Sequence, residues 1–221
     1  LEVWHAEVKR HYWSIEKFCH VEFGAAYNDQ HNMENTVFIG ADFSNSIVTG
    51  VDFFGNDLTE TIFKGADLSN SDLTDVILVD ADLSGANLSG ANLRNADLTN
   101  ANLTGADLSN AVLTNTLLVD ANLSGANLRN ADLSNSKLQN TILSDAVLTG
   151  TNLSNVVLIN TTLTDVDLSD AIFTINDRSY ANLDGNDLSA RNLVGVNLLG
   201  VDLSGKDLSY ANLTGAYLSG K

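Results

Sequence analysis

A large apolar residue recurs at almost every fifth position of this chain, in one register from Val3 to Leu218. The central part reads, in fives, Ala-Asp-Leu-Ser-Gly at 81–85, Ala-Asn-Leu-Ser-Gly at 86–90 and Ala-Asn-Leu-Arg-Asn at 91–95. A period of five matches neither the two-residue period of a strand nor the 3.6-residue period of an α-helix. It therefore predicts a small structural unit that repeats along the chain, as in solenoid proteins.

Each position of the five-residue unit has its own residue type. The central position, at numbers ending in 3 or 8, is Leu or Phe from Phe38 to Leu218, except at Val48 and Arg178. The residue two earlier is small, usually Ala, and we call this the inward position. Between them lies the outward position, at numbers ending in 2 or 7, which is Asp, Asn or a β-branched residue. The following position (4 or 9) is mostly Ser or Thr. The corner position (0 or 5) is mostly Gly, Asn or Asp, which adopt positive φ in tight turns.

These positions predict a square coil with a filled interior. Each unit forms one short extended side and one corner, so four units close a coil of twenty residues. Burying a central side chain contributes about 1.5–3 kcal/mol, and stacked coils are needed to achieve that burial. The absence of proline agrees with a structure in which each coil needs its N–H groups for its neighbours. The predicted core residues include Leu68, Leu83, Leu103, Leu123 and Leu143.

The units resemble the pentapeptide-repeat family, whose pattern is Ala-(Asp/Asn)-Leu-X-X. The resemblance covers about residues 36–220. It implies an all-β fold, a right-handed quadrilateral parallel β-helix. At twenty residues a coil this chain would make about nine coils, in a rod roughly 44 Å long.

The two ends of the repeat are less regular. Trp4, Val8, Ile15 and Phe18 fall at helical spacing, and the expected helical cap occupies residues 1–22, with the β-helix over 23–221. Because the five-residue register extends back to Val3, a continuous β-coil remains an alternative to the cap. A second break occurs at 176–180, where a central arginine would bury an unpaired charge. This unit is expected to bulge outward or to lie near an end of the rod.

Charge and composition narrow the classes of partner. The net charge is −17, and residues 41–175 alone hold 17 acidic and 4 basic side chains. This excess argues against binding to nucleic acid or to an anionic membrane. There is one cysteine and no apolar run of 18 residues, so neither an internal disulfide nor a spanning helix is expected. The cytoplasm is the expected location, with the periplasm or the thylakoid lumen left open if a leader was removed.

The sequence offers no recognisable catalytic, cofactor or metal site. All four histidines lie before residue 32, and their spacing with Cys19 matches no zinc pattern. A Ser-His-Asp arrangement would need the N-terminal segment to meet the coils at one point. No glycine-rich phosphate loop is present, and a rod with a filled axis has no deep cleft. We therefore expect a protein that is not an enzyme, with no cofactor and no small-molecule substrate.

One predicted face of the square, which we call the ladder face, has a second period of forty residues. It consists of the units that begin at residues 36, 56, 76 and so on. Apolar residues occupy its outward and following positions on every second coil, with polar residues such as Asp57, Asp97 and Lys137 between them. Contiguous exposed apolar area often marks a contact surface, although β-branched residues suit any outward strand position. The candidate interaction residues are Val37, Ile39, Ile77, Val79, Leu117, Val119, Val157 and Ile159.

Another predicted face, which we call the acidic face, carries aspartates mixed with Asn87 and Asn127. Its carboxylates could attract a basic partner. The candidate residues of this face are Asp67, Asp107, Asp167, Asp187 and Asp207.

Two functions agree with these features. The first is a structural or interaction module, a rigid acidic rod that presents its faces to a protein partner, with homodimerisation or end-to-end pairing of the C-terminal coil left open. The resemblance supports it, since pentapeptide-repeat proteins are abundant in cyanobacteria and their roles are mostly unassigned. The alternative is a DNA mimic, because similar acidic rods in the family bind DNA gyrase and protect it from quinolones. This chain lacks the aromatic-rich C-terminal helix through which those proteins dimerise, and its outward residues are less bulky.

Overall fold

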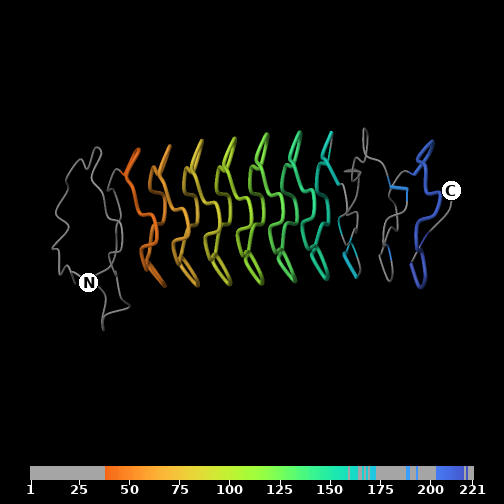
Figure 1. The fold of residues 1–221 in the computed structure, drawn as a ribbon, viewed down its shortest axis with the longest axis horizontal. Coiled ribbons are helices and arrows are strands. Elements are labelled where there is room, and N and C mark those ends of the chain that lie inside the picture. The colour runs from red at the N-terminus through yellow and green to blue at the C-terminus, as the bar shows by residue number, and fades with distance from the viewer. Residues whose placement is uncertain are drawn as a thin grey trace.

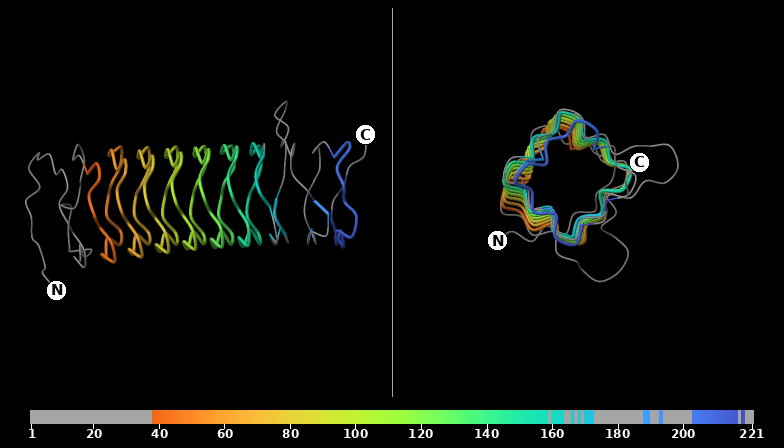
Figure 2. Two further views of the ribbon diagram at one scale, coloured as in Figure 1. Left: turned by 45° about the horizontal axis from the view of Figure 1, so that its top comes forward. Right: turned by 90° about the vertical axis from the view of Figure 1, so that its right-hand side faces the viewer.

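The chain winds into a rod of stacked coils. A computed structural model describes residues 38–158 without a break, and then 160–163, 166, 168, 170–172, 188–189, 193, 203–216 and 218. Figure 1 shows the described coils stacked along one axis, and the end-on view in Figure 2 shows them superimposed around a four-sided outline. The side walls of this part of the rod are therefore nearly flat.

Successive coils are joined by parallel β-bridges between residues twenty positions apart. Asp82 bridges to Asn102, and Asn102 bridges in turn to Asn122. The described residues contain no α-helix and no extended strand, only single-residue bridges, one on each side of the coil. A repeating β-helix is therefore confirmed, and the unbroken stretch 38–158 makes six coils of twenty residues. The cap at 1–22, the start of the rod at residue 23 and the unit at 176–180 lie outside the described residues. The handedness and the total of nine coils stay predictions.

One five-residue unit shows how the backbone hydrogen bonds are distributed. The N–H of Asp82 donates back to the Thr61 carbonyl at 2.9 Å, while that of Leu83 donates forward to the Asn102 carbonyl at 2.7 Å. The Gly85 N–H also donates forward, to Thr104, and the Ala86 N–H closes a turn onto the Leu83 carbonyl at 3.0 Å. Four of the five N–H groups are thus satisfied by backbone, which explains why proline has no place in the repeat.

The corners have the backbone conformation that the sequence predicts. The third residue of each turn has positive φ, as in a type II turn, with values of 64° at Gly85, 61° at Asn100 and 60° at Asp120. Two less common residues, Glu60 and Tyr210, take the same conformation, with φ of 58° and 62°. The prediction that Gly, Asn and Asp make the corners is confirmed.

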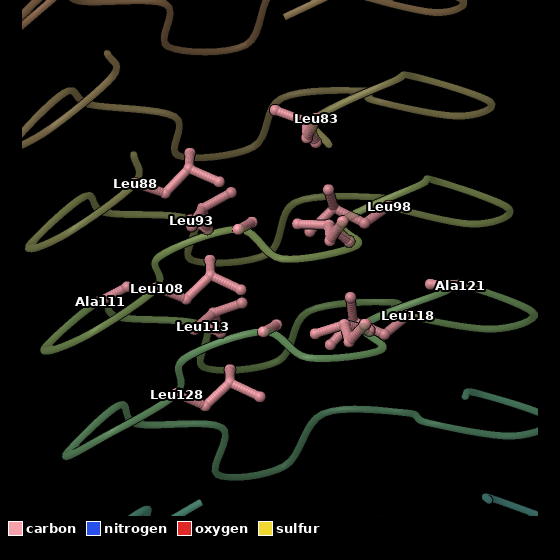
Figure 3. Close-up of a cluster of buried hydrophobic side chains, with 14 of the residues drawn as sticks. Leu83, Leu88, Leu93, Leu98, Leu108, Ala111, Leu113, Leu118, Ala121 and Leu128 are labelled. Atoms are coloured by element: carbon pink, nitrogen blue, oxygen red, sulfur yellow. The ribbon is translucent and has the colours of Figure 1, made fainter. Parts of the chain in front are cut away.

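The axis of the rod is filled by the central side chains (Figure 3). The predicted core residues Leu68, Leu83, Leu103, Leu123 and Leu143 are all fully buried, so this prediction is confirmed. The inward alanines are buried as well and allow facing walls to approach. In the first described coils phenylalanine replaces leucine, and the rings of Phe43 and Phe63 stack with their centroids 5.0 Å apart.

Hydroxyl side chains at inward positions are accommodated by the coil that precedes them. Thr141 Oγ1 donates to the Leu118 carbonyl at 2.7 Å, and Thr151 Oγ1 to the Leu128 carbonyl at 2.8 Å. Two buried inward side chains in the described part of the chain are exceptions, because the hydroxyl of Ser46 and the side-chain amide of Asn56 have no hydrogen-bond partner. Within the described residues, no helix is long and apolar enough to cross a bilayer.

Candidate interaction surface

The structure stacks the outward residues of the ladder face in one column. Bridges connect Asp57 to Ile77, Ile77 to Asp97, Asp97 to Leu117, Leu117 to Lys137 and Lys137 to Val157. We call each coil's contribution to this column a rung, so apolar and polar rungs alternate. Ile77 is 41 % exposed, while Leu117, Val157, Val79 and Val119 are partly exposed. Ile39 is exposed on the first described coil, and Val37 and Ile159 lie outside the described residues.

The other three faces also carry apolar outward residues, but they are sparser. Their members are separated by three or more coils, as Val112 and Ile172 are on one face and Ile62 and Ile142 on another. In the described coils, only the rungs of Ile77 and Leu117 carry a second apolar side chain at the following position, Val79 or Val119. Isolated apolar residues are ordinary on a protein surface. The paired rungs on every second coil distinguish the ladder face.

The structure also reveals what an outward Asp or Asn does, which the sequence analysis missed. Its side-chain oxygen accepts the fifth N–H of the unit, two residues later, which is an Asx turn. Asp97 Oδ1, for example, accepts the Thr99 N–H at 3.0 Å and the Thr99 hydroxyl at 2.6 Å. The signal was present in the sequence, because Asp or Asn stands two residues before Ser or Thr in most units.

The paired apolar rungs lack this hydrogen bond. With Ile77 and Leu117 at the outward positions, the N–H groups of Val79 and Val119 meet no acceptor in the described part of the chain. Local hydrogen bonding would favour Asp or Asn at both outward positions. Departures from locally favourable chemistry are expected where a residue serves a purpose beyond its own unit.

The acidic face lies opposite the ladder face, two units away around the coil, and its carboxylates alternate with amides. Its column runs Asp67, Asn87, Asp107, Asn127, and each asparagine donates to the aspartate one coil earlier. Asn87 Nδ2 lies 3.1 Å from Asp67 Oδ1, and Asn127 Nδ2 lies 3.0 Å from Asp107 Oδ1. The amides therefore separate the carboxylates along the rod. Asp207 is exposed, while Asp167 and Asp187 lie outside the described residues.

Changing Asn87 to aspartate tests this alternation, because the new carboxylate would lie between Asp67 and Asp107. Like charges directly opposite on neighbouring strands are destabilising, so we expect a loss of about 1–2 kcal/mol at pH 7. Protonation relieves the repulsion, so the loss should shrink as the pH falls toward about 4. Urea unfolding at both pH values measures it. Asn122→Asp is the matched control, because its neighbours are Asn102 and Ile142. Equal losses in the two variants would contradict the prediction.

No group of three or more His, Cys, Asp or Glu side chains in the described ranges is arranged to hold a metal ion. The predicted absence of catalytic, cofactor and metal sites stays a prediction. What the described walls offer is contact area, hydrogen bonds and charge.

Comparison with known proteins identifies a family with this repeat. The model of the family described as pentapeptide repeats matches in eight copies, over residues 26–55, 36–75, 77–115, 106–145, 141–174 and 179–220. A comparison with curated proteins found no match.

Several solved structures are similar. One is HetL from the cyanobacterium Nostoc sp. strain PCC 7120, a pentapeptide repeat protein involved in heterocyst differentiation regulation. It is 28% identical with a TM-score of 0.54, over 82% of this chain and 88% of that chain. QnrB1, a plasmid-mediated fluoroquinolone resistance protein, is 25% identical with a TM-score of 0.49, over 82% and 84%. A pentapeptide repeat protein from the Arabidopsis thaliana thylakoid lumen is 36% identical with a TM-score of 0.34, over 46% and 68%. With its twenty-residue coils and the repeat matches along most of its length, the chain belongs to the pentapeptide-repeat family.

Proposed function

We propose that this protein is a non-enzymatic interaction module, a rigid acidic rod that presents its ladder face to a protein partner. The observation that carries the proposal is the set of paired apolar rungs at Ile77 and Leu117. They recur on every second coil, at positions where the repeat's own hydrogen bonding favours Asp or Asn. Exposed apolar area arranged in this way is typical of a contact surface.

The architecture supports the same proposal. Because the central side chains fill the axis, the described coils offer only their outer walls to other molecules. Those walls are flat, and rungs two coils apart are separated by about 10 Å, which gives a partner a regular row of apolar contacts. The polar rungs between them keep the face compatible with water in the absence of the partner.

A double substitution at residues 79 and 119, which are the following positions of the two paired apolar rungs, tests the ladder face. Val79→Lys with Val119→Lys should abolish capture of partner proteins from the source cell, because it places charge beside both paired rungs. Both side chains are only partly buried, so the stability should change by about 0.5 kcal/mol or less per site. Quantitative cross-linking and capture measure the first effect, and thermal unfolding followed by circular dichroism measures the second.

Thr114→Lys with Thr149→Lys is the matched control for that experiment. It adds the same charge at following positions of two other faces, where the backbone N–H also has no acceptor in the described coils. The control should capture partners as the wild type does. Unchanged capture by the Val79 and Val119 variant would refute the proposal.

A DNA mimic that binds DNA gyrase or topoisomerase and protects it against quinolones is the second candidate. Residues 41–175 carry 17 acidic and 4 basic side chains. Over the length of their coils this corresponds to about one net negative charge per 2.5 Å, against about 1.7 Å per charge in duplex DNA. That density supports the candidate. The amides that separate the carboxylates of the acidic face place it second.

A gyrase supercoiling assay with a fluoroquinolone, with and without the protein, separates the two functions. If the protein is an interaction module, the fluoroquinolone should inhibit gyrase supercoiling equally with and without the protein. Protection of supercoiling activity by the protein would reverse the order of the candidates.

A further inference from the structure

We propose that the partner seated on the ladder face is a second copy of this chain. The two rods pack through their ladder faces in antiparallel orientation, about a two-fold axis at Leu117. This inference rests on the proposed function, because it takes the ladder face as the contact surface and identifies what covers it. The order of residues in the column that the β-bridges define supports this pairing.

The column is symmetric in polarity and complementary in charge about Leu117. One coil away lie Asp97 on one side and Lys137 on the other, and two coils away lie Ile77 and Val157. Apolar rungs therefore stand at equal distances from the centre, and so do two rungs of opposite charge. This is the arrangement that a self-complementary surface requires.

The two-fold axis lies between the two packed faces, perpendicular to the rod axis and parallel to the short strand that contains Leu117. Rotation about it reverses the direction of the rod but keeps each residue at the same place along its strand. Leu117 then meets Leu117 of the second copy, Asp97 meets Lys137, and Ile77 meets Val157. By symmetry each of the last two pairs occurs twice. The residues at following positions (numbers ending in 4 or 9) are also complementary in this arrangement. Val119 meets Val119 of the second copy and Thr99 meets Gln139, so apolar side chains face apolar ones and polar side chains face polar ones.

Lys137 is the residue that this arrangement explains best. It is the only basic residue at an outward position in the described part of the chain, and it is exposed between the apolar rungs of Leu117 and Val157. Its ammonium group has no ion-pair partner in the described coils. The antiparallel pair gives it the Asp97 carboxylate of the second copy.

Other registers place like charges together. A parallel pair sets Asp97 at the level of Asp97 and Lys137 at the level of Lys137. An antiparallel pair centred on Asp97 or on Lys137 brings that residue against itself. Because like charges across an interface are unfavourable, the register centred on Leu117 is selected over these alternatives.

The size of the surface sets the expected affinity. The five rungs from Ile77 to Val157 extend over four coil spacings, about 19 Å, on a face one short strand wide. Such an area is smaller than that of a standard stable interface and corresponds to a weak complex. The dimer should therefore form in the micromolar range and weaken as salt screens the two charge pairs.

Sedimentation velocity of the full chain, from about 5 to about 500 µM, tests the pairing by charge exchange. The wild type should shift from monomer to dimer across this range. Asp97→Lys alone and Lys137→Asp alone should each weaken the dimer about tenfold or more, because each creates two like-charge contacts. The double variant, Asp97→Lys with Lys137→Asp, should restore it. Asp82→Lys and Lys64→Asp, on another face, are matched controls and should behave as the wild type.

Leu117→Asn separates association from folding. The new side chain can accept the Val119 N–H and donate to Asp97, as Asn87 does to Ser89 and Asp67. Its melting temperature should equal or exceed that of the wild type, while the dimer is lost. A Leu117→Asn variant that associates as the wild type does would overturn the proposal.

Cross-linking tests the orientation. Facing sheets lie about 10 Å apart, beyond the reach of a disulfide, so a short bismaleimide is the suitable reagent. In a Cys19→Ser background, a mixture of Ile77→Cys and Val157→Cys chains should give a cross-linked dimer, and neither chain alone should. Efficient cross-linking of Ile77→Cys with itself would contradict the antiparallel arrangement.

The failure of this inference can be told apart from the failure of the proposed function. A wild type that stays monomeric up to the highest concentration overturns the self-pairing. If partner capture still depends on Val79 and Val119, the interaction module stands with a different occupant. If capture is independent of both residues as well, both proposals fail.

Discussion

Replacing Leu103 with aspartate is expected to abolish cooperative folding of the rod, or to lower its free energy of unfolding by more than about 4 kcal/mol. Leu103 is fully buried on the axis, between coils whose central residues are also fully buried. A carboxylate there would have neither water nor a partner. Stability in a solenoid depends on contacts between neighbouring coils, so the loss should divide the rod into two weakly coupled parts. Urea unfolding followed by circular dichroism measures the effect.

Thr104→Asp is the control, because this neighbouring residue is exposed and its change should be nearly neutral. Leu103→Ala should fall between the two, with a loss of about 2–5 kcal/mol from the cavity it leaves. If Leu103→Asp and Thr104→Asp unfold at the same urea concentration, the axis of the rod is not where the structure places it.

Replacing Gly105 with valine is expected to lower the free energy of unfolding by about 1–3 kcal/mol. Gly105 occupies a corner with φ of +66°, and no atom lies within 4 Å of a Cβ placed there. The loss would therefore come from the backbone alone, because a β-branched residue disfavours positive φ. Thermal unfolding of the purified variant measures it.

Gly105→Asn is the control for the corner. Asparagine occupies equivalent corners at Asn95, Asn100 and Asn115, with φ of 58°, 61° and 60°. This variant should lose only a few tenths of a kcal/mol relative to glycine, because asparagine tolerates the left-handed region. Equal losses for valine and asparagine would show that backbone conformation does not govern this position.

The sequence predicted the features that repeat with the five-residue unit. Within residues 38–158, Leu103, Gly105 and their counterparts have the same environment in each coil, so residue type alone reports whether a position is buried or lies at a corner. The twenty-residue coil then placed Ile77, Asp97 and Leu117 in one column, as the bridges show. Few globular folds are predictable to this degree, because few have contacts set by a single fixed sequence separation.

The hydrogen bonds of the outward side chains were not predicted. Whether Asp97 turns back to Thr99, or Asn87 reaches across to Asp67, depends on side-chain direction within the formed coil. The sequence therefore showed that asparagines are mixed with the aspartates of the acidic face, but not that their amides donate to the carboxylates one coil earlier. An Asp followed by an Asn twenty residues later is the pattern that could have indicated the pairing. The sequence contains no comparable pattern that identifies what binds the ladder face, because the binding partner is another molecule.

Amide hydrogen exchange at Val79 and Val119, followed by NMR in dilute and in concentrated protein, tests most directly whether the ladder face is the contact surface. Both N–H groups lack an acceptor in the described coils, as does that of Thr114 on a neighbouring face. All three should exchange rapidly in the dilute protein. With rising concentration, exchange at Val79 and Val119 should slow while Thr114 stays unchanged. Equal slowing at Thr114, or no change at any of the three, would contradict the account.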